Sequence, residues 1–207
     1  MQGMLERNQI FIGDTGDLGQ SIWLKPLGRA FTAGSESKAV DFGWQNPPTP
    51  TLDRPPDTRL RASCHCSGVQ FEIVPPSDGK RYTARLDTCS SCRRSAGFEI
   101  MAWASVPLTK IQMPDGTPLN LSSGTLKEYV SSHGHRRYFC SVCGAKVFIR
   151  KDNESCVEVA VGILKAEEGA RAEKWLDWIG EVGSIKEATD QDLLDIVRQS
   201  LKTWTNG

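Results

Sequence analysis

The chain has 207 residues, of which 39% are hydrophobic and 24% charged, and its 25 basic side chains balance its 25 acidic ones. Zero net charge gives no electrostatic case for binding nucleic acid or an anionic membrane surface, and no run of about 18 apolar residues predicts a transmembrane helix. Residues 1–8 have neither the basic flank nor the apolar core of a signal peptide. We therefore expect a cytoplasmic protein with reduced thiols, whose cysteine pairs are metal ligands or reactive groups.

Residues 1–59 are expected to form an N-terminal extension that ends in a proline-rich linker. Residues 10–12 could form a short strand, and residues 13–19 are rich in turn formers. This turn-rich segment lacks the Gly-Lys-Ser/Thr ending of a phosphate-binding loop, so we interpret it as a surface loop. The linker prediction rests on five prolines within ten residues, which exclude a helix or a central strand. They are Pro47, Pro48, Pro50, Pro55 and Pro56.

Residues 60–180 are predicted to form the main domain, with a mostly antiparallel β structure. Val69, Phe71 and Ile73 alternate with polar residues, as in a half-buried strand. Gly, Pro and Ser separate the apolar runs at short intervals, which is typical of many short strands joined by tight turns. Further strands are expected at residues 98–106, 126–131, 137–140, 146–150 and 157–161.

The end of the chain changes to a helical pattern. Residues 181–207 are predicted to be a helical segment, with Thr189 as a candidate N-cap. Four apolar residues share one face of this helix: Leu193, Val197, Leu201 and Trp204. We expect that face to pack on the chain's own domain, with a partner-binding helix as the alternative. Residues 164–178 are predicted as a second helix.

Six of the seven cysteines fall in three close pairs. The pairs are Cys64 and Cys66, Cys89 and Cys92, and Cys140 and Cys143. Such spacings let two thiolates point at one metal ion from a tight turn. Four thiolates complete a closed structural zinc site, and the first and third pairs are the natural set. One zinc ion held by both pairs would tie the start of the domain to its late hairpin, so losing the site is expected to cost the fold.

The middle pair has only two sulfurs, whereas a catalytic zinc takes three protein ligands and keeps one open position. Asp87, two residues before Cys89, is the nearest candidate for the third ligand. A carboxylate donates less charge than a thiolate, so a zinc ion held by Asp87, Cys89 and Cys92 is expected to be a stronger Lewis acid that is held more weakly. Two alternatives stay open: free thiols on a turn, and an Asp87 carboxylate that caps the turn through backbone N–H groups.

Five other side chains could take part in chemistry. Arg93 could bind a substrate carboxylate through two hydrogen bonds or form a surface ion pair. His133 and His135 lie in a segment expected to be an exposed loop, and either could reach the middle cysteine pair as a ligand or general base. His65 is expected to be exposed. Cys156 is unpaired and is expected to be a small buried apolar group.

Three motifs in order give the chain a family resemblance. They are Cys64-x-Cys66-Ser67-Gly68, Cys89-x-x-Cys92-Arg93 and Phe139-Cys140-x-x-Cys143-Gly144. This set resembles the glutathione-dependent formaldehyde-activating enzyme family, which includes the centromere protein V type of domain. The resemblance covers roughly residues 60–164. It implies a Mss4-like, or β-tent, fold of antiparallel sheets around a structural zinc on the first and third pairs.

The resemblance also implies a second zinc on a Cys-x-Cys-x-x-Cys motif. In this chain the motif carries Asp87 in place of its first cysteine, while Cys89 and Cys92 match. The family's reaction adds glutathione to formaldehyde, and the change of ligand puts both metal occupancy and that substrate into question. Residues 10–15 resemble the segment that follows such a domain in fungal tandem members, so residues 1–59 are interpreted as a possible remnant of a preceding domain.

Three functions follow from these observations. The first is a zinc-dependent carbon–sulfur lyase that acts on a glutathione or other thiol–aldehyde adduct, or on a related small electrophile, with Asp87, Cys89 and Cys92 at the metal and Arg93 orienting an anionic substrate. The second is a zinc-stabilised binding or scaffold module without catalysis. The third is a thiol redox protein that uses the middle cysteine pair. The first is preferred. The sequence predicts no particular oligomeric state.

Overall fold

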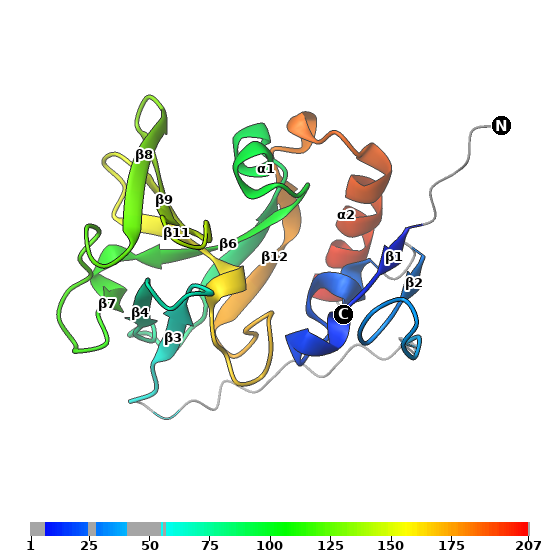
Figure 1. Cartoon of the computed structure of the whole chain (residues 1–207), viewed down its shortest axis with the longest axis horizontal. Helices are drawn as coiled ribbons and strands as arrows, with labels where there is room; N and C mark the ends of the chain where they lie inside the picture. Colours follow the sequence, from blue (N-terminus) through cyan, green and yellow to red (C-terminus); the bar gives the residue numbers. More distant parts are fainter. Residues whose placement is uncertain (1–6, 25–27, 41–54, 56, 207) are drawn as a thin grey trace.

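The computed structural model describes residues 7–24, 28–40, 55 and 57–206 of the chain. Its main element is a seven-stranded sheet (Figure 1). In spatial order the strands are β12 (Leu176–Gly183), β5 (Tyr82–Asp87), β6 (Met101–Pro107), β11 (Cys156–Ala160), β10 (Lys146–Lys151), β9 (His135–Cys140) and β8 (Leu126–Ser132). Neighbouring strands pair antiparallel except β12 and β5, which are parallel.

A smaller antiparallel sheet packs against one face of the large one. It comprises β3 (Leu60–Ser63), β4 (Gln70–Ile73) and β7 (Ile111–Gln112), the last preceded by the 3-10 turn η3 (Leu108–Lys110). Along β4 the side chains of Phe71 and Ile73 are buried, as their alternation with polar residues predicts. The rings of Phe71 and Phe148 on β10 lie 4.9 Å apart, so the main core fills the space between the two sheets.

Strand β6 serves two hydrophobic clusters because its side chains alternate between the faces of the sheet. Ala102, Ala104 and Val106 point into the main core. Met101 and Trp103 point to the opposite face, where they pack with residues of α1 (Ser90–Ala96). This smaller hydrophobic group contains Cys92, which is 1% exposed.

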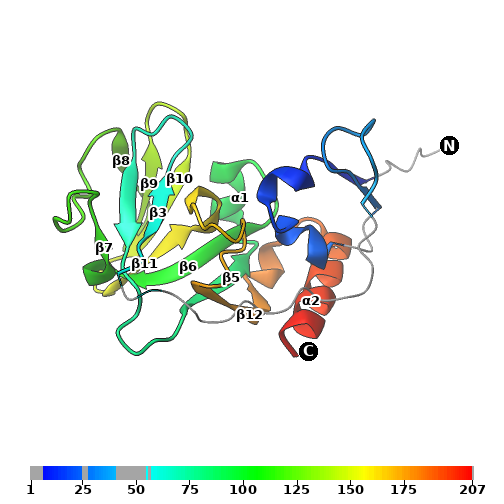
Figure 2. The same cartoon turned by 90° about the horizontal axis from the view of Figure 1, so that it is seen from below.

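The C-terminal helix α2 (Gln191–Asn206) packs on β12, after the 3-10 turn η5 (Ile185–Glu187). The N-terminal segment lies against the other side of this helix (Figures 1 and 2). It contains a parallel pair, β1 (Asn8–Gln9) and β2 (Arg29–Ala30), and two 3-10 turns, η1 (Ile12–Thr15) and η2 (Gly19–Trp23). The indole ring of Trp23 makes edge contacts with Trp178 and Trp204, at centroid distances of 5.0 and 5.5 Å.

A buried arginine fastens the N-terminal segment to the main domain. Arg171, 3% exposed, pairs with the carboxylates of Glu173 and Asp17 and donates to the backbone carbonyl oxygen of Gly19 at 2.7 Å. The Asp17 carboxylate in turn accepts from the backbone N–H of Arg171 at 2.8 Å. The bonds to Asp17 and Gly19 connect residues more than 150 positions apart and fix where η2 begins.

The fold prediction is confirmed in its main parts. The described chain is mainly β, its sheets are mostly antiparallel, and a C-terminal helix closes it. The predicted apolar face of that helix packs on the chain's own core, with Val197 and Leu201 buried and Leu193 and Trp204 partly buried. A strand lies at each of the six apolar runs that predicted one, including β4. The Mss4-like assignment stays an implication of the family resemblance.

Three local predictions are wrong. Residues 164–178 are not a helix: after the 3-10 turn η4 (Val161–Ile163), the chain makes irregular turns and then forms β12 from Leu176. Ala172 there has a φ of 50°, which a right-handed helix excludes. Asp190, not Thr189, caps α2, because its carboxylate accepts from the N–H of Leu193 at 3.0 Å. The expected strand at residues 10–12 is instead the end of a loop and the start of η1, since the strand β1 is Asn8–Gln9.

The predicted division into residues 1–59, 60–180 and 181–207 stays a prediction, and β12 runs across the second of its boundaries. Most of the expected proline-rich linker, including Pro47, Pro48 and Pro50, lies outside the described residues. Within the described part of the chain, no helix has both the length and the apolar character that crossing a membrane requires.

Candidate metal centres

The first cluster consists of Cys64, Cys66, Cys140 and Cys143, whose sulfur atoms all lie within 4.8 Å of one another. Cys66 Sγ is 3.6 Å from Cys64 Sγ and 3.5 Å from Cys140 Sγ. A tetrahedral zinc ion with Zn–S bonds of about 2.3 Å needs sulfur atoms roughly 3.8 Å apart. The four cysteines therefore fit a closed metal site as they stand, and the pairing predicted from sequence is the one that the fold brings together.

Two turns deliver these sulfurs. Cys64 and Cys66 lie in the turn between β3 and β4, where Ser67 has a φ of 59° and its N–H donates to the Cys64 carbonyl at 3.0 Å. Cys140 and Cys143 lie in the turn between β9 and β10, and it closes through the N–H of Gly144, which donates to the Cys140 carbonyl at 2.9 Å. Gly144 has a φ of 74°, a conformation that glycine adopts without strain.

Further donors reach the sulfur of Cys140. The Thr125 hydroxyl lies 3.0 Å from it, and the backbone N–H of Cys143 donates to it at 3.5 Å. Burial works to raise the pKa of Cys140, but the bonds from the Cys143 backbone and the Thr125 hydroxyl lower it to about 6. For Cys66, the hydrogen bond from the Gly68 backbone lowers the pKa. The neighbouring thiol of Cys140 and burial outweigh this effect and raise the pKa of Cys66 to about 12. A metal ion displaces such protons, so its affinity falls as the pH falls.

The second cluster consists of Asp87, Cys89 and Cys92, which offer one carboxylate and two sulfurs within 4.8 Å of one another. Asp87 ends β5, and Cys89 is the N-cap of α1. The Asp87 Oδ2 atom lies 3.9 Å from Cys92 Sγ, while its Oδ1 atom accepts from the backbone N–H of Cys89 at 3.1 Å. Both roles weighed for Asp87 are thus compatible, because one oxygen caps the turn and the other faces the sulfurs.

The helix α1 holds the two cysteines on one side. Cys89 Sγ accepts from the backbone N–H of Cys92 at 3.2 Å, as a capping side chain does. The two sulfurs are 2.8 Å apart, about 1 Å less than a tetrahedral zinc requires. The donor set suits a zinc ion with an open fourth position, but the sulfurs have to move apart to receive it.

A buried arginine completes the second cluster, and the sequence prediction missed it. Arg137 on β9 is 7% exposed, and its guanidinium donates to Cys92 Sγ at 3.4 Å and to Cys89 Sγ at 3.8 Å. Two anionic sulfurs, the Asp87 carboxylate and a divalent metal sum to one negative charge, which Arg137 neutralises. Such partners of metal ligands tune affinity and reactivity.

The sequence signal for Arg137 is weak. In β9 it alternates with Tyr138, which points into the main core, so the two-residue period places Arg137 on the opposite face. Only the order of the strands shows that this face meets α1. Burial and the Cys89 thiol raise the pKa of Cys92 to about 12, and the charge of Arg137 opposes this rise. The thiol redox alternative stays a prediction.

The sequence model of the glutathione-dependent formaldehyde-activating enzyme family matches residues 59–179, more than half of the chain. The chain belongs to this family. A search of curated proteins found no match. Among solved structures, the crystal structure of a Rhodobacter sphaeroides protein is similar with 22% identity and a TM-score of 0.39, covering 57% of this chain and 99% of that one.

At Asp87, the second cluster of this chain differs from the motif that the family resemblance implies. The carboxylate stands where the family resemblance implies a cysteine, and the structure brings it to the two sulfurs. Among the described residues no histidine joins either cluster. His65 and His133 are exposed, and His135 Nδ1 lies 3.0 Å from the carbonyl oxygen of His133 in the β8–β9 turn.

Two of the remaining candidates have ordinary surroundings. Arg93 Nε lies 3.4 Å from a Glu99 carboxylate oxygen, which is the ion pair weighed as its alternative role. Glu99 also accepts from the Thr189 hydroxyl at 2.8 Å, so this pair helps to hold the start of α2. A role of Arg93 toward substrate stays a prediction. Cys156 begins β11, half-buried and outside both clusters.

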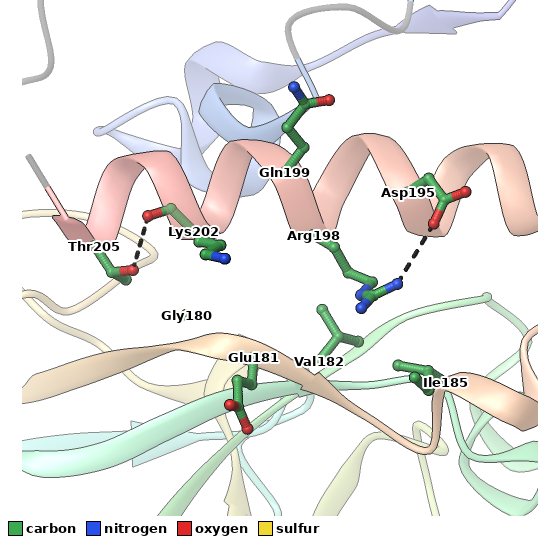
Figure 3. Close-up of a pocket in the computed structure, with 9 residues that line it drawn as sticks. All are labelled: Gly180, Glu181, Val182, Ile185, Asp195, Arg198, Gln199, Lys202 and Thr205. Carbon is green, nitrogen blue, oxygen red and sulfur yellow. Dashed lines mark hydrogen bonds and ion pairs between the residues drawn. The ribbon is translucent and has the colours of Figure 1, made fainter.

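Two cavities lie near the helices. The α1 cavity, about 480 Å³, is lined by residues that include Gln20, Ala96, Met101, Cys143, Lys146 and Ala160. The α2 cavity, about 670 Å³, lies between β12 and α2 (Figure 3), and Arg198 and Lys202 point into it. None of its lining residues belongs to either cluster, and Arg198 already pairs with Asp195 at 3.6 Å. The α1 cavity is therefore the one that borders the cysteine chemistry.

Proposed function

We propose that this protein is a zinc-dependent enzyme of the carbon–sulfur lyase type, which makes or breaks the bond between a thiol sulfur and an aldehyde carbon. The observation that carries the proposal is the second cluster: three ligand side chains, one short of a closed zinc site, beside a buried arginine. Membership in a family described as glutathione-dependent and formaldehyde-activating supports glutathione as the thiol.

The two clusters would have different roles, one structural and one catalytic. Cys64, Cys66, Cys140 and Cys143 would hold a structural zinc that joins the small sheet to the β9–β10 turn. Asp87, Cys89 and Cys92 would hold a second zinc, which when bound supplies Lewis acidity to a thiol or a carbonyl oxygen. The ligands of this second zinc would leave one position for a small molecule.

The chain's own residues set the properties of that second site. Arg137 donates to both ligand sulfurs and withdraws charge from them, and Asp87 supplies a weaker donor than a third thiolate. Both effects favour a more acidic metal site. In the condensing direction the sulfur–carbon bond forms, the carbonyl π bond breaks, and the thiol proton ends on the former carbonyl oxygen; cleavage is the reverse, so no oxidant or reductant is needed.

The test is catalysis of adduct exchange. Zinc-loaded protein is added to glutathione and formaldehyde at equilibrium, and the exchange rate of the hydroxymethyl group is measured by NMR, then repeated with larger aldehydes. We expect exchange above the uncatalysed rate for at least one aldehyde, and its loss in Cys89→Ser. Uncatalysed rates for every aldehyde tested, with the second zinc shown to be bound, would contradict the proposal and leave a binding module.

A further inference from the structure

The α1 cavity lies beside both clusters: Cys143 of the first cluster lines it, and residues that pack around Cys92 of the second cluster line it too. Ala96, Met101 and Ala160 line this cavity and also pack around Cys92, so the cavity lies beside the second cluster. Its volume of about 480 Å³ is in the range of small-molecule sites. The cavity is therefore placed to hold the parts of a substrate that do not react.

Lys146 is a cationic residue in the wall of this cavity. Lys146, at the start of β10, is half-buried, and no carboxylate of the described residues forms an ion pair with it. Its ammonium group lies 5.7 Å from the ring centre of Phe139 and 6.0 Å from that of Tyr129. Burial and the charge of Arg137 lower the pKa of Lys146. Arg137 already faces the sulfurs of the second cluster, so Lys146 is the charge in this cavity that can receive a negatively charged group.

A residue from outside the family-matched region forms part of the wall. Gln20 in η2 lines the cavity, half-buried, and no described residue forms a side-chain hydrogen bond with it. It follows Gly19, whose carbonyl accepts from the buried Arg171 at 2.7 Å. Arg171 thus fixes η2 so that the Gln20 amide, which can donate and accept, reaches the cavity.

An apolar recess continues from the cavity. The recess, about 180 Å³, shares Gln20, Phe98 and Ile100 with the α1 cavity. Beyond these shared residues its wall is mostly apolar, with Trp23, Leu24, Leu86, Leu193 and Val197. Phe98 at the junction is 53% exposed, so the recess can be reached from solvent. A single-carbon group such as that of formaldehyde would leave this recess largely unfilled.

We propose that the α1 cavity and its recess bind the substrate as a carboxylate-bearing thiol whose sulfur carries an apolar substituent larger than one carbon, with the carboxylate on Lys146 and the substituent in the recess. This inference rests on the proposed lyase function for the identity of the ligand as substrate. It makes the aldehyde partner a larger, apolar one, and it gives the N-terminal segment a part in selectivity through Gln20.

The test uses stable thioethers that cannot react. The dissociation constants of S-methylglutathione and S-hexylglutathione are measured by calorimetry on the full, metal-loaded chain. We expect S-hexylglutathione to bind at least tenfold more tightly, since each buried methylene contributes favourably. Equal affinities, or no binding of either compound, would overturn the proposal.

Variants then place the two ends of the ligand. Lys146→Met is expected to weaken both compounds about tenfold, because a hydrogen bond to a charged group is lost. Ile100→Trp, which fills the junction, is expected to remove the advantage of the hexyl compound and keep methyl binding. Lys202→Met in the α2 cavity is the matched control and is expected to change neither. An effect of Lys202→Met in place of Lys146→Met would move the site and overturn the proposal.

The outcomes separate this inference from the proposed function. Lys146-dependent, hexyl-selective binding without catalysed exchange for any aldehyde contradicts the lyase function and keeps the binding site. Catalysed exchange that is unchanged in Lys146→Met and equally fast for formaldehyde and hexanal keeps the lyase function and overturns the site. Circular dichroism of each variant confirms that the fold is intact.

Discussion

The two cysteine clusters place the same kind of ligand in different surroundings. The first cluster joins two turns from separate sheets, and backbone N–H groups and the Thr125 hydroxyl surround its sulfurs. The second cluster sits on one strand end and one short helix, with a carboxylate in place of a thiolate and a guanidinium beside it. The two clusters thus differ in the number of sulfurs and in the groups that contact those sulfurs, although both are built from cysteine pairs.

The largest effect is expected at the first cluster. Cys140→Ser removes a ligand that is fully buried and joins β9 to the turn of β3 and β4. Since zinc binding is folding free energy in such sites, the loss is most of about 10 kcal/mol, and we expect no stable fold. Thermal unfolding followed by circular dichroism measures it. Cys156→Ser is the control, with the melting temperature close to wild type. A cooperative transition of Cys140→Ser near that temperature would show that this cluster does not hold the fold.

The second cluster is expected to lose function without losing the fold. Cys89→Ser removes a metal ligand, but serine keeps the N-cap of α1, which Cys89 now provides through its sulfur. We expect catalysed adduct exchange to fall at least 100-fold, while the free energy of unfolding falls by much less than in Cys140→Ser, because only the stabilisation by the second zinc is lost. Urea unfolding and the NMR exchange assay measure the two quantities. If unfolding changed as much as in Cys140→Ser, the contrast between the clusters would be lost.

A smaller effect is expected from the arginine of the second cluster. Arg137→Met keeps the length of the side chain and removes the charge that balances the ligands. We expect zinc affinity at the second cluster to fall about 10- to 100-fold, as is common for partners of metal ligands. Competition with a chromophoric chelator measures it. Arg136→Met is the matched control, because Arg136 pairs with Glu128 and Asp152 and not with the cluster. Unchanged affinity in Arg137→Met would remove this residue from the site.

The smallest effect is expected from the side chain that contacts a sulfur of the first cluster, as Arg137 contacts those of the second. Thr125→Val removes the hydroxyl that lies 3.0 Å from Cys140 Sγ and keeps the shape of the side chain. One lost hydrogen bond to a sulfur predicts a decrease in unfolding free energy of about 1 kcal/mol. Urea unfolding detects it, with Thr117→Val at an exposed turn as the control. A decrease in zinc affinity at the second cluster instead would mean that the two sites are coupled.

The sequence predicted the clusters well because ligand spacing is local. Cys-x-Cys and Cys-x-x-Cys pairs fix two sulfurs each within a turn, and Asp87 is close enough to Cys89 to be weighed. Arg137, Lys146 and Gln20 could not be found in this way. They meet the cysteines through strand order, through the face on which a strand's side chains lie, and through the Arg171 contacts that place η2.

The wrong helix at residues 164–178 has a related cause. Trp175 and Trp178 are three positions apart, a spacing that fits a helical face, but Leu176 and Trp178 alternate inward in β12. Over so short a run the two periods are hard to tell apart. The positive φ at Ala172 excludes the helix, and an alanine in the sequence does not predict a positive φ.

The number of zinc ions per chain shows whether the protein binds two zinc ions in unlike sites. Protein purified with reductant and without added metal is measured for the wild type, Cys89→Ser and Asp87→Asn. We expect about two ions in the wild type and about one in each variant, because three ligands hold the second ion and four hold the first. About one ion in all three proteins would contradict the account, because Asp87, Cys89 and Cys92 would then bind no metal.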